Sequence, residues 1–357
     1  MNSSQEKSTT VRTKSAKSAT SAKPRDPLER QAARLRPLFG VLERVAPGIG
    51  AQLAWKLWSI PRRPNAQAVA RSREGGAGEV RTVRISLPDW TGRRPTTRDG
   101  KPKPPRGIDI TVELLGPQDG PIVYLLHGWS GRRGQLAPIG RRLAAGGYRV
   151  VLIDTPNHGD SGAGALGSRH SLLPDFSLTL AGVIREFGPA YAVVGHSLGA
   201  ACSAIVLAER ARAEKAVFIA PPIDPVAYTR ILATMLGFGE RIRTRMIRIG
   251  ERRAGIELAS FALEAMLEQP AVLERLADLP PALVVHDTYD PVVPVVTGRT
   301  LAAHWPGSRI IETADLGHNR ILRDEAVIAA VVEFVDDHTE ADGARRNGDV
   351  NRASVAG

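Results

Sequence analysis

Ser197 is the side chain in this sequence best suited to covalent chemistry. It stands in the middle of Gly-His-Ser-Leu-Gly (195–199), after the apolar run 191–194 and before an alanine-rich helical pattern at 200–212. We therefore predict a strand, a sharp turn and a helix with the serine at the apex, because a glycine on each side lets the backbones of such a turn approach closely. The turn exposes the hydroxyl group, and the N–H groups that begin the helix point toward the same position. This pattern is typical of a serine nucleophile.

The nucleophile needs a base, because an unactivated serine hydroxyl scarcely ionises near neutral pH. We predict that His318 is the base, since it follows a strand pattern that ends near residue 311 and precedes the last predicted helix. Gly317 lets the loop turn so that the imidazole reaches inward. His196 is closer to the serine in sequence, but as its direct neighbour in the turn it is expected to point away from the hydroxyl group.

The base in turn needs a carboxylate that orients the imidazole. Asp290 is the predicted acid, because it follows the apolar strand pattern 282–285 and a proline-rich turn holds the end of its loop. Asp287, three residues earlier, and Asp224, after the strand pattern 216–220, stay open as alternative acids. The order serine, aspartate, histidine, each after a predicted strand, argues against coincidence.

A serine that attacks a carbonyl carbon also needs two hydrogen-bond donors for the oxyanion. The backbone N–H of Leu198, directly after the nucleophile, is the first predicted donor. The second is expected from the loop 127–131, His-Gly-Trp-Ser-Gly, which follows the apolar run 122–126. Gly128 lets this backbone turn, and the N–H of Trp129 is the predicted donor.

These side chains must be positioned by strands that alternate with helices. Strand-like apolar runs occur at 122–126, 149–153, 191–194, 216–220, 282–285 and 308–311. Helical patterns between them predict an α/β fold with a mostly parallel sheet and right-handed crossovers. Two earlier segments, 80–87 and 108–115, alternate apolar and polar residues and predict an antiparallel pair at one edge.

Two helical regions lie outside this alternation. Residues 28–60 predict two helices that are broken near Pro47, and residues 223–279 carry only helical patterns, at 225–238, 240–253 and 256–267. The predicted organisation is a disordered basic tail (1–27), an N-terminal helical segment (28–75), a core in two parts (76–222 and 280–338) interrupted by a helical insertion (223–279), and a disordered tail (339–357).

Together these motifs resemble the α/β-hydrolase superfamily over roughly residues 76–338. The matching segments are the His-Gly-Trp loop, residues 154–161 (Asp-Thr-Pro-Asn-His-Gly-Asp-Ser), the Gly-His-Ser-Leu-Gly turn, Asp290, and Gly317-His318. The resemblance implies an α/β-hydrolase fold with the insertion as its lid, two-step acyl transfer through Ser197, and no metal or organic cofactor. Asp287 stands where many members have glycine, so the choice between the two aspartates stays open.

A serine nucleophile in this superfamily implies a serine hydrolase of carboxylic esters with a small-molecule substrate. A thioesterase or acyltransferase of the same fold is the alternative among enzymes, and a ligand-binding module that kept the triad is the alternative outside them. A further alternative is a lipid hydrolase that contacts a membrane surface through Trp55, Trp58 and the basic tail. We favour packing of the N-terminal helices on the catalytic domain or a partner subunit.

The formal net charge of +11 suggests nucleic-acid binding at first. Much of the excess lies in the N-terminal tail, the loop 93–106 and the helix 241–253, and no nucleic-acid-binding motif accompanies it, so this function is not expected. The single cysteine, Cys202, makes no internal disulfide and is interpreted as a small buried residue. The sequence has neither a transmembrane run nor a secretory signal, which favours a cytoplasmic protein, with a targeting role for the tail as the alternative.

Overall fold

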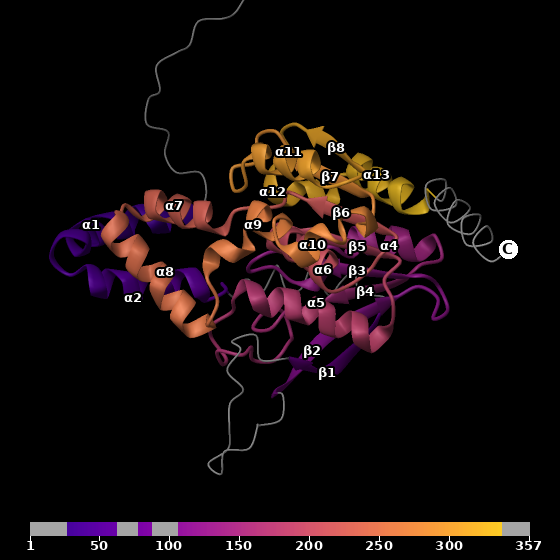
Figure 1. Cartoon of the computed structure of the whole chain (residues 1–357), viewed down its shortest axis with the longest axis horizontal. Helices are drawn as coiled ribbons and strands as arrows, with labels where there is room; N and C mark the ends of the chain where they lie inside the picture. The colour runs from indigo at the N-terminus through magenta and orange to yellow at the C-terminus, as the bar shows by residue number, and fades with distance from the viewer. Residues whose placement is uncertain (1–26, 63–77, 88–105, 338–357) are drawn as a thin grey trace, which may run out of the picture.

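The sheet of this protein has eight strands in the order β1-β2-β4-β3-β5-β6-β7-β8 (Figure 1). The computed structural model describes residues 27–62, 78–87 and 106–337. The strands are β1 (Glu79–Leu87), β2 (Arg106–Leu115), β3 (Ile122–Leu126), β4 (Arg149–Ile153), β5 (Ala192–His196), β6 (Lys215–Ile219), β7 (Ala282–Asp287) and β8 (Ser308–Thr313). The pairs β1–β2 and β2–β4 are antiparallel, and every other pair is parallel. The predicted α/β class, the mostly parallel sheet and the antiparallel edge are confirmed.

The helices of the described residues follow the strands in the expected alternation. They are α1 (Pro27–Val45), α2 (Pro47–Ser59), α4 (Ala137–Ala145), α5 (Leu173–Phe187), α6 (Leu198–Glu209), α7 (Pro225–Leu236), α8 (Glu240–Ala254), α9 (Leu263–Leu267), α10 (Pro270–Leu273), α11 (Val295–His304), α12 (Gly317–Arg320) and α13 (Glu325–Asp336). Short 3-10 turns add η1 (Arg133–Gln135), η2 (Leu258–Phe261), η3 (Leu276–Asp278) and η4 (Ile321–Arg323). None of the helices in the described part of the chain combines the length and apolar character needed to cross a bilayer.

The central strands are apolar along most of their length because both faces of the sheet are covered. Tyr124 and Leu126 of β3 belong to the apolar core on the face of α5, α6 and α11, where Cys202 is also buried. Their neighbours Val123 and Leu125 belong to the core on the opposite face, against α4 and α13. Successive side chains of a strand point to opposite faces, so a doubly covered strand is apolar on both faces, and its polar residues lie mainly at its ends.

The predicted helix 256–267 is wrong, because the chain breaks there into η2 and α9. Ala262 between them has an extended backbone with ψ 143°. The N–H of Leu263 then donates to the carbonyl oxygen of Ile223, at 2.8 Å. This contact ties the insertion to the segment after β6, and a tertiary hydrogen bond thus replaces the continued helix.

The N-terminal helices α1 and α2 pack on α7 and α8 of the insertion rather than on the sheet. The shared apolar cluster includes Phe39 and Trp55 from the N-terminal pair and Ile242 and Met246 from α8. Figure 1 shows the four helices together at one end of the molecule, beside the sheet. The predicted break at Pro47 is confirmed, since α2 begins with that proline, which suits the first turn of a helix.

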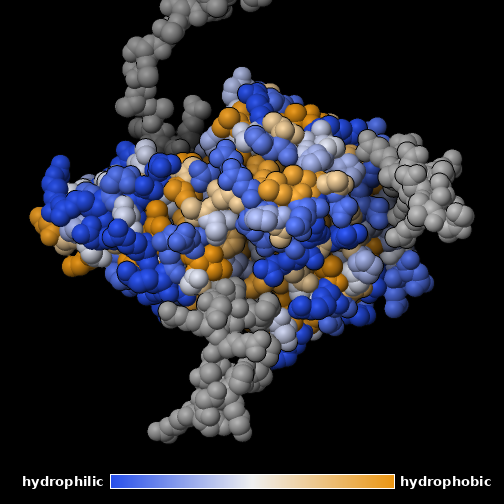
Figure 2. Space-filling model, viewed as in Figure 1, coloured by the Kyte–Doolittle hydropathy of each residue, from blue (hydrophilic) through white to orange (hydrophobic). Residues whose placement is uncertain are grey.

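The turn between α1 and α2 carries exposed apolar side chains. Val41, Val45 and Ile49 are 56%, 74% and 66% exposed, and Figure 2 shows apolar residues at this end of the molecule. The two tryptophans considered as membrane contacts lie elsewhere, because Trp55 is buried under α8 and Trp58 borders an internal cavity. Most of the predicted tail 1–27, residues 63–75 of the N-terminal segment, most of the loop 93–106 and the tail 339–357 lie outside the described residues.

Candidate active site

Ser197 occupies a strained turn between β5 and α6. Its φ and ψ are 53° and −126°, a region that residues with a side chain rarely adopt and that costs about 1–3 kcal/mol. Both flanking glycines are required by close approaches: a Cβ on Gly195 would lie 2.5 Å from the Cα of Ala200, and a Cβ on Gly199 would lie 2.3 Å from the carbonyl oxygen of Leu126. The pattern read from the sequence therefore forms the predicted strand, turn and helix.

Asp290 and His318 form a direct pair. The Oδ2 atom of Asp290 lies 2.7 Å from Nδ1 of His318, which donates the hydrogen bond. The other oxygen of Asp290 accepts from the backbone N–H groups of Val292 and Val293, at 2.8 and 3.0 Å. Burial by itself raises the pKa of this carboxyl group, but the hydrogen bond and charge of His318, with the two N–H groups, bring it below its usual value. Asp290 is thus held as a carboxylate that orients the imidazole.

The two alternative aspartates serve local structure instead. Asp287 accepts hydrogen bonds from the N–H of Leu316 and the hydroxyl of Thr313, both at 2.9 Å, and so holds the segment that leads to His318. Asp224 caps α7 by accepting from the N–H groups of its first turn. The structure therefore brings Asp290, and neither alternative, to the imidazole of His318.

His196 has a partner that sequence reasoning missed. Its Nε2 donates to the backbone carbonyl of His318 at 2.9 Å, and the two rings are in tilted contact with centroids 4.8 Å apart. Burial, reinforced by the nearby His318, lowers the pKa of His196 to about 3. His196 is therefore a neutral donor that helps to position His318. This role could not be predicted from the sequence, because the two residues are far apart in the chain.

The loop after β3 lies directly against Ser197. A Cβ on Gly128 would lie 2.7 Å from the Cβ of Ser197 and 3.3 Å from its Oγ, so only glycine fits there. Leu126 pairs with Gly195 in the sheet, which brings the ends of β3 and β5 together. Trp129 follows, and its ring stacks on Phe176 with centroids 6.3 Å apart. The backbone at residues 128–129 is thus beside the serine hydroxyl group.

Two buried histidines brace this loop. His127 donates through Nδ1 to the carbonyl oxygen of Gly128 at 2.7 Å and accepts through Nε2 from the N–H of Thr155 at 3.1 Å. His158 donates to the carbonyl oxygen of Pro156 at 2.9 Å and accepts from the N–H of Ser130 at 3.1 Å. Each ring is one donor and one acceptor, which requires the neutral form.

Asp154 provides a second support for the same loop. Its Oδ1 accepts from the backbone N–H of Arg133 at 2.7 Å, its Oδ2 accepts from the N–H of Asp160 at 3.0 Å, and the guanidinium of Arg133 pairs with it. A Cβ on Gly159 would collide with the carboxylate of Asp154. This explains part of the pattern at 154–161, whose aspartate and glycine pack against each other.

We expect the protein to lose stability in mild acid because of these histidines. Burial is the main cause that lowers the pKa of His127 to about 4 and those of His158 and His196 to about 3, from an ordinary value of 6.5. Below about pH 6.5 these histidines bind protons in the unfolded chain but stay neutral in the folded protein. The free energy of unfolding therefore falls as the pH falls toward 4, by up to about 1.4 kcal/mol per pH unit for each histidine.

Urea unfolding at about pH 7 and at about pH 5 measures this loss. The variant His158→Gln should show a smaller difference between the two pH values, whereas His304→Gln, at an exposed position, should keep the wild-type difference. Equal stability of the wild type at both pH values would contradict the assignment of neutral buried imidazoles.

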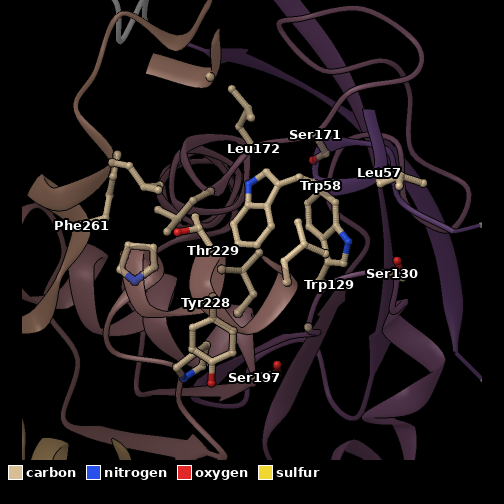
Figure 3. Close-up of a pocket in the computed structure, with 18 of the residues that line it drawn as sticks. Leu57, Trp58, Trp129, Ser130, Ser171, Leu172, Ser197, Tyr228, Thr229 and Phe261 are labelled. Atoms are coloured by element: carbon tan, nitrogen blue, oxygen red, sulfur yellow. The ribbon is translucent and has the colours of Figure 1, made fainter. Parts of the chain in front are cut away.

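A cavity of about 550 Å³ opens beside Ser197. Ser197, Leu198 and His318 line one part of it, together with Gly128 and Trp129. The rest of the wall is mainly apolar and comes largely from α2, α7, α8 and the segment after α8, with further contributions from residues 171–174 and 292–293 (Figure 3). Its volume is that of a site for a small organic molecule. Among the described residues, no group of three or more His, Cys, Asp or Glu side chains is arranged to hold a metal ion.

Comparisons with known proteins agree with the observed fold. The sequence profile of the alpha/beta hydrolase family matches residues 123–331. A pimeloyl-(acyl-carrier protein) methyl ester esterase of Stenotrophomonas maltophilia is 28% identical over 269 residues, which cover 66% of this chain and 98% of the relative. The protein of the same name from Nitrosospira multiformis is 34% identical over 115 residues, or 31% of this chain and 41% of the relative. The solved structure of a membrane phospholipase A, described as a bacterial virulence factor, is similar with a TM-score of 0.50 at 16% identity, covering 86% of this chain and 98% of that one.

Proposed function

Because the chain belongs to the α/β hydrolase family, we propose that it is a serine hydrolase that cleaves carboxylic esters of small molecules. Ser197 is the nucleophile, His318 the general base and Asp290 the residue that orients the base. The observation that carries this proposal is the buried Asp290–His318 hydrogen bond at 2.7 Å, with His318 and the strained Ser197 lining the same cavity.

In the first step, the Oγ atom of Ser197 attacks the carbonyl carbon of the ester while Nε2 of His318 takes the hydroxyl proton. The carbonyl oxygen becomes an oxyanion, which accepts hydrogen bonds from the backbone N–H groups of Leu198 and Trp129. Asp290 stabilises the imidazolium form of His318. When the tetrahedral intermediate collapses, the C–O bond to the alcohol breaks and His318 gives its proton to the leaving oxygen.

In the second step, a water molecule takes the place of the alcohol. His318 removes a proton from the water as it attacks the acyl-enzyme carbonyl, and a second tetrahedral intermediate forms. Its collapse breaks the bond to Ser197, whose Oγ regains a proton from His318, and the carboxylic acid leaves. Neither step uses a metal or an organic cofactor.

Ester hydrolysis is also supported by the relatives, since two of them are named methyl ester esterases. Thioester hydrolysis is the second candidate, because it uses the same nucleophile, base and oxyanion donors on a different leaving group. The helices of residues 223–279 are the proposed lid, and they supply part of the cavity wall above Ser197.

A fluorophosphonate probe tests the activated serine, and p-nitrophenyl esters test the reaction. We expect the probe to modify the peptide that contains Ser197, and the esters to be hydrolysed with release of p-nitrophenol. An acyl-thioester substrate measured in parallel distinguishes the two leaving groups. Tight binding of esters without turnover and without labelling would contradict the proposal and favour a ligand-binding protein.

A further inference from the structure

The wall of the cavity includes a segment that lies outside the residues matched by the family profile. Helix α2 and the residues after it contribute Leu57, Trp58, Ile60 and Arg62 to the lining, whereas the family profile begins at residue 123. This part of the wall therefore comes from the N-terminal region, before the matched residues. Because this wall lines the same cavity as Ser197, it can influence which substrates bind there.

Helix α2 is held tightly against α8. A Cβ added to Gly50 would lie 2.4 Å from the Cδ1 of Ile242, and a Cβ added to Gly250 would lie 2.6 Å from the ring of Trp55. One glycine on each helix thus allows the two backbones to approach closely. Such packing fixes α2 on the insertion as a rigid element.

The C-terminal end of α2 is held by the catalytic core. The hydroxyl of Ser59 lies 2.7 Å from Nδ1 of His170, and the carbonyl oxygen of Ser59 accepts from the N–H of Ser171 at 2.9 Å. Beyond the helix, the N–H of Arg62 donates to the hydroxyl of Ser130 at 2.9 Å. Because Ser130 belongs to the loop that supplies the proposed oxyanion donor, the N-terminal segment reaches the reacting centre itself.

Most of the side chains that α7 and α8 contribute to the cavity wall are apolar, although Tyr228, Thr229 and Glu251 also line it. Leu232 and Met235 come from α7, and Met246 and Ile247 come from α8. In Figure 3, Trp58 lies below Leu172 and to the left of Leu57, with Tyr228 and Ser197 toward the bottom of the view. The space between the tryptophan and the insertion is therefore suited to an apolar chain, and its volume of about 550 Å³ is far more than an acetyl group needs.

We propose that the cavity-lining residues Leu57, Trp58, Ile60 and Arg62 form part of the substrate site, and that Trp58 is a specificity-determining residue that selects esters with a long apolar acyl chain. The expected kinetic effect rests on the proposed ester hydrolysis. The site for the acyl chain itself does not depend on whether Ser197 reacts. Burial of each methylene group contributes about 0.8 kcal/mol. A chain of ten carbons in this cavity is therefore held much more strongly than an acetyl group.

The kinetic test compares p-nitrophenyl decanoate with p-nitrophenyl acetate. We expect Trp58→Ala to lower the ratio of the two kcat/KM values by roughly 10- to 100-fold, the range for loss of one large apolar contact. Lys56→Ala is the matched control, because Lys56 is on the same helix, exposed, and outside the cavity lining. It should leave the ratio unchanged. Trp58→Phe keeps a ring and should restore most of the preference.

A binding test separates this proposal from the proposed reaction. Calorimetry with sodium decanoate on the variant Ser197→Ala should show binding. In the double variant that also carries Trp58→Ala, the Kd for decanoate should rise at least tenfold. If alanine at position 58 lowers the melting temperature strongly, Trp58→Leu replaces it in both tests. An unchanged Kd, or an unchanged decanoate-to-acetate ratio, would overturn the assignment of Trp58. Decanoate binding without turnover of any ester would leave this site standing and would reject the proposed function.

Discussion

Replacing Ser197 by alanine is expected to lower kcat for ester hydrolysis by about 10⁶-fold, the effect of removing the nucleophile from a serine triad. The remaining residues cannot replace the lost hydroxyl, because His318 then has no nucleophile to activate. The substitution removes one oxygen from a side chain whose neighbours on both sides already fix the turn. We therefore expect the melting temperature to change little. Release of p-nitrophenol, measured with substrate in excess, gives the rate.

A matched serine provides the control for this experiment. Ser260 is exposed in η2, and its hydroxyl donates to the carbonyl oxygen of Glu257 at 2.7 Å. Ser260→Ala should keep wild-type turnover and wild-type labelling by a fluorophosphonate. Oxyanion donors and substrate binding alone supply much less than about a hundredth of the wild-type rate. If Ser197→Ala retained more than that, the nucleophile would be another residue.

Replacing Asp290 by asparagine is expected to lower kcat by about 10⁴-fold. The asparagine amide offers a donor where the carboxylate accepted, so His318 Nδ1 must turn into an acceptor and Nε2 then carries the proton. In that tautomer His318 cannot take the proton of Ser197. The rate at saturating substrate measures the loss. KM should change less than kcat, because Asp290 does not line the cavity.

Asp287→Asn separates the two aspartates that the sequence left in competition. Asp287 holds the N–H of Leu316 and the hydroxyl of Thr313, so its variant should be less stable and keep most of its activity below its melting temperature. Because the pKa of Asp287 is also below its ordinary value, its contribution to stability is present above the usual aspartate range and is lost as the pH falls through the lowered pKa. A 10⁴-fold loss for Asp287→Asn with full activity for Asp290→Asn would reverse the roles.

The order of strands and helices was predictable because a strand that is buried on both faces has a continuous apolar run in its sequence. Helix α11 was missed, and its sequence explains the failure. It begins with Val295, Val296 and Thr297, whose branched side chains favour strands, and then has Gly298. A Cβ on this glycine would lie 2.4 Å from His286, so close packing on β7 selected a poor helix former. The helix propensity of residues 295–304 does not reflect that contact, because His286 belongs to another element.

The candidate site residues and their order along the chain were predictable from the sequence. The hydrogen-bond partners of these residues were not. The motif around Ser197 is local, and all its requirements lie within five residues. The choice of Asp290 over Asp287 depends on groups that follow each by more than twenty positions, namely His318, Thr313 and Leu316. The cavity wall made by α2 was equally hidden. Amphipathic spacing showed that one face of the N-terminal helices is buried, but not that its partner is α8.

The docking of α1 on α8 also has a consequence for how this chain acquires its fold. The carboxylate of Glu43 accepts from the N–H groups of Arg241 and Ile242, which follow it by 198 and 199 positions. Contacts between such distant segments form slowly, because the entropy of closing the intervening loop opposes them. During synthesis the N-terminal helices leave the ribosome well before α8 does, with their apolar faces uncovered. The substrate cavity is therefore expected to be completed last, after the sheet has formed, and the nascent chain is most prone to aggregation in that interval.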